Sequence, residues 1–224
     1  MLVLHYTGMT TGPAALERLR DPAAKVSAHY LIEEDGRLFQ LVPEERRAWH
    51  AGVSSWRGTT DVNGRSIGVE LVNPGHEFGY RDFPLAQVET AIRLLDDIRE
   101  RWTIPDSFIL GHSDVAPARK TDPGERFPWR RLWAAGHGLW AEPAPAPGEA
   151  MSAGDRGPGV AVLRGALARL GYGLKSGDAY DDDLRLTVAA FQRHWAPHRV
   201  DGVADGETRS RLMAVLETAR GGEA

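Results

Sequence analysis

Residues 2–8, LVLHYTG, and residues 111–124, GHSDVAPARKTDPG, decide the fold and the chemistry of this chain. The first stretch is a short apolar run, which predicts a buried strand with His5 near its end. The second follows another apolar run and contains three chemically useful residues: His112, Lys120 and Asp122. Two histidines and one aspartate can bind zinc and leave a fourth position for water. Both histidines would lie at one edge of a sheet if their strands are neighbours.

Spacing alone leaves a metal site unproven, because a single histidine after a strand lies more often on the surface or in the core. The chain has eight histidines, and most of them are not expected to be ligands. Lys120 is either a solvated loop cation or a group that stabilises a developing negative charge. Glu70, in the apolar run 66–73 (SIGVELVN), is either an outward-facing strand carboxylate or an acid–base group.

Composition is that of a globular protein with one or two domains. Of 224 residues, 42% are hydrophobic and 26% are charged. The net charge of −4 argues against a nucleic acid partner. There are no cysteines, which excludes disulfides and thiolate metal sites, so any metal must be held by histidine and carboxylate.

No feature of the sequence predicts a membrane segment or an export signal. No apolar run approaches the roughly 20 residues that span a bilayer. The first ten residues, MLVLHYTGMT, lack a basic segment, a long apolar segment and a small-residue cleavage site. As written, the chain is expected in the cytoplasm; an export signal upstream of Met1 would instead place it in the periplasm or cell envelope. We expect a monomer.

The composition changes at residues 141–150, AEPAPAPGEA. Proline and alanine in this density favour an extended, semi-rigid linker. The alternative is a long surface loop within a single domain. We place a boundary here, which gives a first domain at 1–140 and a second at 151–224.

The first domain mixes strands and helices. Residues 29–42 are two apolar segments joined by Asp35-Gly36, a strong hairpin signal. Residues 66–73 and 107–110 are predicted strands, and apolar residues at helical spacing predict a helix over 84–102. This alternation is typical of an α/β fold with a mixed β-sheet flanked by helices.

The second domain is small and helical. Leucines and aromatics at helical spacing line three segments, which are centred on residues 160–170, 184–195 and 212–216. With roughly 70 residues, such a bundle has a thin core and is near the lower limit of independent stability.

Five motifs in the first domain carry a resemblance to a known family. In order they are LVLHYTG, AHYLIEEDG, AWHAG, SIGVELVNPG and GHSDVAPARKTDPG. Together they resemble the zinc-dependent N-acetylmuramoyl-L-alanine amidases of the AmpD/AmiD type, which are related to peptidoglycan recognition proteins. The resemblance covers about residues 1–140, and the last motif is its most specific part.

The resemblance implies a role for each residue of the candidate site. His5, His112 and Asp122 would be the zinc ligands, Glu70 the catalytic acidic residue and Lys120 the catalytic lysine. The substrate would be peptidoglycan or a muropeptide, cut at the amide between (anhydro)muramic acid and L-alanine. Zinc would activate water, Glu70 would move its proton, and Lys120 would help to stabilise the oxyanion.

Other residues are weaker candidates. Trp49 and His50, in AWHAG, are similar to family positions that line the substrate groove, and Arg119 is expected to meet a stem-peptide carboxylate. A purely structural role is equally compatible with all three. For His29 we expect packing, and four histidines have no assigned site: His76, His137, His194 and His198.

The second domain resembles the three-helix peptidoglycan-binding domain that is often attached to wall hydrolases. The resemblance covers about residues 151–217 and rests on Leu-Gly-Tyr, Ala-Phe-Gln and Asp-Gly elements. A tethered module of this kind raises the local concentration of the active site on a polymer, which favours murein over small soluble muropeptides. The alternative is a helical module that stabilises the chain and binds nothing.

Two other functions remain as alternatives. A binding-only peptidoglycan sensor would lack stoichiometric metal, so zinc content distinguishes it from an amidase. A glycosidase would need paired carboxylates, but Glu70 has no evident acidic partner. Its products would be sugars that still carry their peptides.

Overall fold

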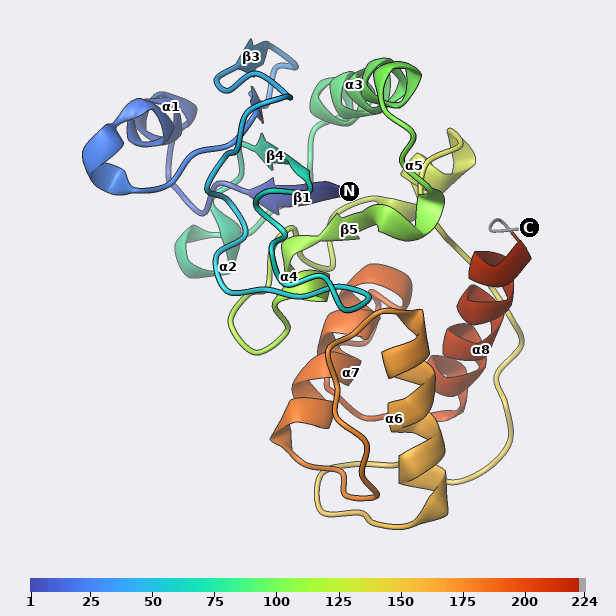
Figure 1. Ribbon diagram of the computed structural model, residues 1–224. Coiled ribbons are helices and arrows are strands. Elements are labelled where there is room, and N and C mark those ends of the chain that lie inside the picture. Colours follow the sequence, from blue (N-terminus) through green and yellow to red (C-terminus); the bar gives the residue numbers. More distant parts are fainter. Residues whose placement is uncertain (222–224) are drawn as a thin grey trace.

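The computed structural model describes residues 1–221, and its strands form a mixed five-stranded sheet in the first part of the chain (Figure 1). The sheet order is β3-β2-β4-β1-β5. Neighbours pair in parallel except at the β2–β3 edge, where the predicted Asp35-Gly36 hairpin is confirmed. The strands are β1 (Leu2–Tyr6), β2 (Tyr30–Ile32), β3 (Leu38–Gln40), β4 (Ile67–Leu71) and β5 (Ile109–Gly111). The expected α/β fold is therefore confirmed.

The central strand β1 sets the position of the candidate site. Its apolar residues Leu2, Val3 and Leu4 are completely buried, as expected for a parallel strand covered on both faces. In the parallel register, His5 lies beside Glu70 of β4. Leu4 lies beside Gly111 of β5, the residue before His112. Three predicted site residues therefore meet at the carboxyl ends of neighbouring strands.

Helix α3 (Leu85–Arg101) confirms the helix predicted over 84–102. It buries Val88, Leu95 and Ile98, and its buried Gln87 side chain donates to the carbonyls of Ile32 and Val72 at 2.9 and 3.0 Å. Trp102 follows the helix and is 39% exposed. The sequence pattern did not predict the shorter helices, α1 (Gly12–Arg20), α2 (Gly75–Phe78), α4 (His112–Val115) and α5 (Trp129–Ala134).

The strand predicted over 107–110 is shorter than expected. Residues Asp106–Phe108 form a 3-10 turn, and β5 begins only at Ile109. The turn follows Pro105, whose carbonyl accepts a hydrogen bond from the Phe108 amide at 2.9 Å. Local turn formation after proline thus replaces the first two residues of the expected strand.

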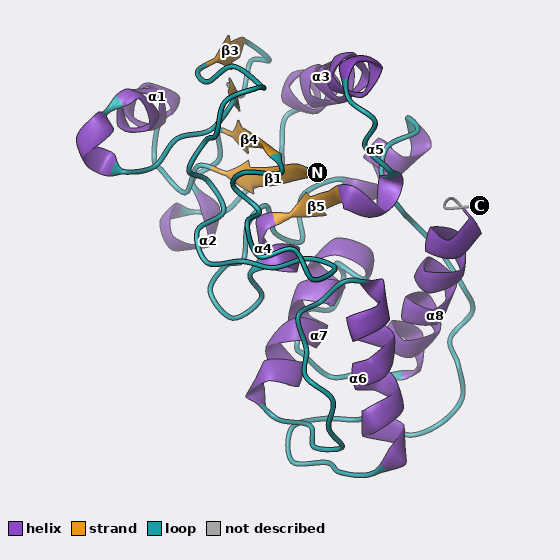
Figure 2. Cartoon of the chain, in the orientation of Figure 1, coloured by secondary structure: helices purple, strands orange, loops and turns teal. Residues whose placement is uncertain are grey.

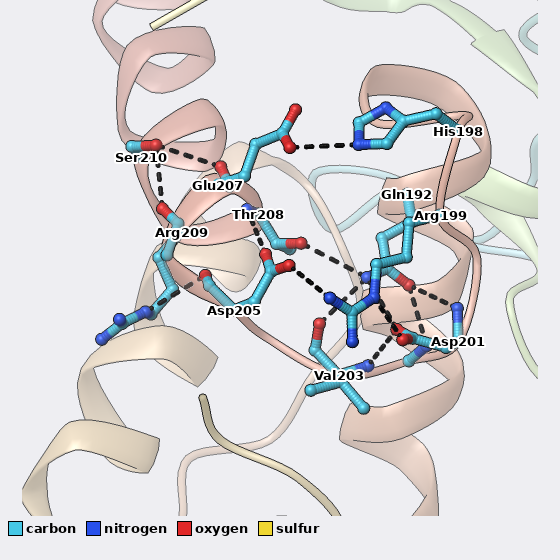
Figure 3. Close-up of polar contacts among 12 residues, drawn as sticks. Gln192, His198, Arg199, Asp201, Val203, Asp205, Glu207, Thr208, Arg209 and Ser210 are labelled. Carbon is cyan, nitrogen blue, oxygen red and sulfur yellow. Dashed lines mark hydrogen bonds and ion pairs between the residues drawn. The ribbon is translucent and has the colours of Figure 1, made fainter. Parts of the chain in front are cut away.

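The second part of the chain consists of helices, as Figure 2 shows. Gln192 of α7 is completely buried and fixes the Asp-Gly loop before α8. Its amide oxygen accepts from the Asp201 and Gly202 amides at 3.1 and 2.8 Å, and its amide nitrogen donates to Val203 (Figure 3). Three helices result, α6 (Pro158–Leu170), α7 (Asp182–Trp195) and α8 (Gly206–Gly221).

Residues 141–150 contain no helix or strand and run toward the second part of the chain. The Ala146 amide donates to the carbonyl of Gly206 at 3.0 Å. The domain boundary itself stays a prediction, and residues 222–224 of the expected second domain lie outside the described residues. Within residues 1–221, none of the helices combines the length and the apolar character that crossing a bilayer requires.

The helices α6–α8 pack directly against the first part of the chain, next to α4 (Figure 1). The Trp195 indole donates to the carbonyl of Leu139 at 2.9 Å, and the Arg57 amide donates to the carbonyl of Gly171 at 2.8 Å. Buried side chains of both parts belong to one continuous apolar cluster. The thin core of the helical bundle is thus extended by the surface on which it sits.

Gly171 offers a test of this packing. It has a φ of +151°, and a Cβ atom there would lie 2.5 Å from the ring of Trp56, across the contact. We expect Gly171→Ala to lower the free energy of unfolding by about 1–3 kcal/mol, the usual cost of overpacking. Denaturant unfolding measures the change.

Gly165, in the middle of α6, is the matched control. A Cβ atom at this exposed position would meet nothing within 4 Å. Gly165→Ala should therefore be neutral or stabilising by about 0.5–1 kcal/mol, because alanine favours helix. Equal effects of the two substitutions would contradict a tight contact at Gly171.

Candidate metal centre

Three predicted ligands converge on one point. His5 Nδ1, His112 Nδ1 and Asp122 Oδ2 lie 3.0 Å from one another in every pairing. All three side chains are buried, with at most 6% of each residue exposed. Together these three residues can hold a metal ion, and they form the candidate metal site among the described residues.

The surroundings of His112 determine which ring nitrogen carries the proton. Its Nε2 lies 3.0 Å from the carbonyl of Ala51. A carbonyl oxygen only accepts hydrogen bonds, so this nitrogen must carry the hydrogen in the neutral ring. The Nδ1 lone pair then faces Asp122 and His5. Arg119 donates to the same carbonyl at 2.9 Å and so holds it in place.

A chain of hydrogen bonds fixes the His5 ring in the same way. Ser66 Oγ donates to the carbonyl of Val62 and therefore accepts from His50 Nε2 at 3.2 Å. His50 Nδ1 is left as an acceptor, and His5 Nε2 donates to it at 3.0 Å. The Nδ1 lone pair of His5 consequently faces the other two ligands. Such partners behind a ligand orient its ring and fix its tautomer.

The electrostatics of the cluster call for a cation. Burial lowers the pKa of His5 to about 4, and the adjacent His112 adds to the decrease, so His5 is neutral at neutral pH. Two lone pairs and one carboxylate oxygen, 3.0 Å apart, therefore face each other. Nitrogen and oxygen donors of this kind suit a divalent first-row metal.

Glu70 and Lys120 line the same pocket as the three ligands, which has a volume of about 410 Å³. Oxygen Oε2 of Glu70 is shielded from solvent and has no hydrogen-bond partner. Burial raises the pKa of Glu70 well above its usual range, the charge of Asp122 adds to the increase, and Lys120 opposes it. A carboxyl group of this kind can exchange protons near neutral pH.

The weaker candidates lie in different places. His50 is buried behind His5, as described above. Trp49 is 55% exposed at the rim, where the Arg47 guanidinium lies 4.5 Å from the centre of its ring. Arg119 is exposed but donates to the carbonyls of Ala51 and Val53. Their predicted contacts with substrate stay predictions.

A second, larger hollow adjoins the pocket. It has a volume of about 960 Å³ and shares Trp49 and Arg119 with the metal pocket. Its far wall belongs to the helical part of the chain and includes Lys175, Asp183 and Thr187. Both parts of the chain therefore line this hollow beside the metal pocket.

Sequence reasoning missed several groups around the ligands. The carbonyl of Ala51 and the hydroxyl of Ser66 have no sequence signal, because any residue has a carbonyl and serine is common. Asp114, two residues after His112, is 1% exposed and bonds to the second part of the chain. The one sequence signal for Asp114 is its charge within the motif GHSDVAPARKTDPG, directly after an apolar run.

Comparison with known proteins identifies the family. Residues 1–125 match the family described as "N-acetylmuramoyl-L-alanine amidase", and residues 156–212 match the one described as "Putative peptidoglycan binding domain". The chain belongs to the N-acetylmuramoyl-L-alanine amidases. The amidase AmiD of Escherichia coli K12 is 38% identical over 233 residues, which cover 97% of this chain and 82% of AmiD. The 1,6-anhydro-N-acetylmuramyl-L-alanine amidase AmpD of the same organism is 44% identical over 110 residues, 48% of this chain and 57% of AmpD.

Solved structures agree over both parts of this amidase. AmiD from E. coli, in complex with anhydro-N-acetylmuramic acid-L-Ala-D-gamma-Glu-L-Lys, superimposes with a TM-score of 0.83 at 37% identity. The match covers 97% of this chain and 88% of that one. AmpDh3 from Pseudomonas aeruginosa, in complex with anhydromuramic pentapeptide, gives 0.84 at 33% identity and covers 97% and 91%. The predicted family and fold are thus confirmed.

The raised pKa of Glu70 predicts an unusual pH dependence of stability. Between the ordinary carboxyl pKa and the raised pKa of Glu70, the folded chain keeps a proton that the unfolded chain has lost. The Glu70 contribution to the free energy of unfolding therefore falls as pH rises through this range. Without metal, Glu70→Gln should be more stable than the unaltered protein at about pH 8 and similar at about pH 4. Thermal unfolding across this range, with chelator present, measures it, and a gap that widens toward low pH would contradict it.

His50 provides a test of the hydrogen-bond chain. His50→Phe keeps a ring but cannot accept the His5 Nε2 hydrogen. We expect metal affinity to fall by about 10- to 100-fold, the usual effect of losing such a partner, as measured by competition with a chelator. The control is His29→Phe: His29 is also buried and packs on His50, but it bonds to Arg46 and Gly68, not to a ligand. A change in substrate KM alone would instead indicate direct contact of His50 with substrate.

Proposed function

We propose that this amidase is a zinc enzyme that hydrolyses the amide between the lactyl group of N-acetylmuramic or anhydro-muramic acid and L-alanine. One observation carries the proposal. The lone pairs of His5 and His112 and the carboxylate of Asp122 face a single point in a pocket that also contains Glu70.

The ligand set supports zinc as the metal. Two imidazoles and one carboxylate are a common catalytic zinc set, with a fourth position left for water. Zinc bonds to such atoms at about 2.0–2.1 Å, so tetrahedral ligands lie about 3.3 Å apart. The three atoms here lie 3.0 Å apart, close to that spacing.

Zinc, when bound, supplies an activated water and polarises the substrate carbonyl. Glu70 then acts as the proton carrier. Its buried carboxylate accepts a proton from the attacking water and delivers it to the nitrogen of the leaving alanine. The reaction adds one water across the C–N bond, which leaves a carboxyl group on the sugar and an amine on the peptide. A raised pKa suits both halves of this transfer.

Lys120 stabilises the transition state in this proposal. Its ammonium group is the cation that acts on Glu70 and on His5. As the amide carbon becomes tetrahedral, its oxygen gains negative charge, and a fixed cation beside it lowers the barrier. The same charge favours the ionised form of Glu70, the form that accepts a proton.

The substrate that we propose is a muramyl peptide, free or within murein. The solved relatives AmiD and AmpDh3 hold anhydro-muramyl peptides. Trp49 and Arg119 stand between the metal pocket and the larger hollow, where they would contact substrate. The hollow is bordered on its far side by the segment between α6 and α7 and by α7, and it gives room for the chain of a polymer beside the cut amide.

Hydrolysis of purified murein and of an anhydro-muramyl tripeptide tests the proposal. With zinc, the protein should release free stem peptides with an L-alanine amine, detected by mass spectrometry. Chelation and His112→Ala should each abolish activity. Glu70→Gln should retain zinc but lose about 10²- to 10⁴-fold in kcat, the usual contribution of a general base.

Two outcomes would overturn the proposal. Sugars that still carry their peptides would indicate a glycosidase. Full activity of His112→Ala after exhaustive chelation would show that the cluster is not the reaction centre. Zinc content of the unaltered protein, measured by mass spectrometry of the element, is the control for metal loading.

A further inference from the structure

Asp114 is a buried carboxylate that no step of the reaction uses. It lies two residues after His112, is 1% exposed, and accepts three hydrogen bonds. One comes from the Gly111 amide at 2.8 Å. The other two come from the second part of the chain, from Tyr172 Oη at 2.9 Å and His194 Nδ1 at 2.7 Å.

The two donors are firmly held. The His194 ring is stacked between Trp129 of the first part and Trp195 of its own helix, with ring centroids 3.6 Å away on both sides. The Tyr172 ring packs edge-on against Trp56. Burial and the charge of Asp114 raise the pKa of Tyr172, so its hydroxyl stays protonated and donates.

Asp114 in turn fixes the turn that carries a metal ligand. Its bond to the Gly111 amide closes the first turn of α4, in which His112 is the first residue. The amide of Ser113, two residues after Gly111, donates to the carbonyl of Asp122 at 2.9 Å, so two ligands share this turn. The backbone at Gly111 is closely packed, because a Cβ atom there would lie 2.7 Å from Pro123.

Loss of one donor has a predictable effect. A buried carboxylate with an unfilled acceptor site is costly, so the side chain or its backbone shifts to find water or another donor. A shift at Asp114 moves the Gly111–His112 peptide. Metal ligands must be held within about half an ångström of their working geometry, so such a shift weakens binding.

We infer that the helical second domain is a positioning element of the metal centre. Tyr172 and His194, acting through Asp114, hold the turn of His112 in the geometry that binds metal. The domain therefore has a role in the active site in addition to any contact with the cell wall. This inference rests on the proposed function in one respect, the assignment of zinc as the metal.

The test compares two tyrosines in the full-length protein. Tyr172→Phe removes the hydroxyl that bonds to Asp114, and Tyr180→Phe removes one that donates to the carbonyl of Gly202 within the second domain. Both residues are 2% exposed, and each loses one buried hydrogen bond. Chelator competition measures Zn²⁺ affinity, and thermal unfolding measures the loss of stability.

We expect Tyr172→Phe to bind Zn²⁺ about 10-fold more weakly than the unaltered protein, the lower end of the effect of partners behind a ligand. Tyr180→Phe should lower the unfolding temperature similarly and keep full affinity. In the metal-free protein, amide hydrogen exchange at Gly111 should be faster in Tyr172→Phe only. His194→Gln, which keeps a side-chain amide donor, should retain more affinity than His194→Ala.

Two results would overturn the inference. One is equal Zn²⁺ affinity of the Tyr172→Phe and unaltered proteins. The other is unchanged exchange at Gly111 in the metal-free Tyr172→Phe protein. Failure of the proposed function looks different, because the unaltered protein would then bind no Zn²⁺ at all.

Discussion

The parallel pairing of β1 with β4 on one side and β5 on the other is the constraint on which the site depends. It places His5 beside Glu70 and brings His112 to the same end of the sheet. The site also requires a small residue at one position of β4. A Cβ atom at Gly68 of β4 would lie 2.5 Å from the His50 ring, so only glycine leaves room for the residue that orients His5. The positions of His5, Glu70 and His112 thus follow from one arrangement of strands.

Much of this arrangement was predictable from the sequence. Apolar runs and helical spacing indicate the strands and the long helix, and Asp35-Gly36 indicates the hairpin. The ligands are recognisable because each lies in a specific motif, although the pattern alone did not settle their role. The short helices were not predictable, since four to nine residues give too few periods, and Pro105 converts the start of an expected strand into a turn.

What the sequence could not indicate is how its two parts meet. Asp114 and His194 are 80 positions apart, and neither carries a local signal of its partner. The linker composition suggested a tethered module, whereas the helices α6–α8 are packed on the first part of the chain. Long-range contacts between buried polar groups depend on the completed fold, so local pattern and propensity do not reveal them. An isolated bundle of this size has a thin core and low stability. Packing on the first part of the chain is favourable because it adds to the apolar surface that the bundle buries.

The packed position of α6–α8 changes what an anchoring domain can do. A flexible tether lets an active site search a sphere around its attachment point, with a reach set by linker length. Here the helices α6–α8 are packed on the first part of the chain, so the active site lies at one distance and in one direction from them. If a polymer were held by these helices, the active site would reach only the bonds at a fixed distance from the held unit, because the two parts of the chain are packed together.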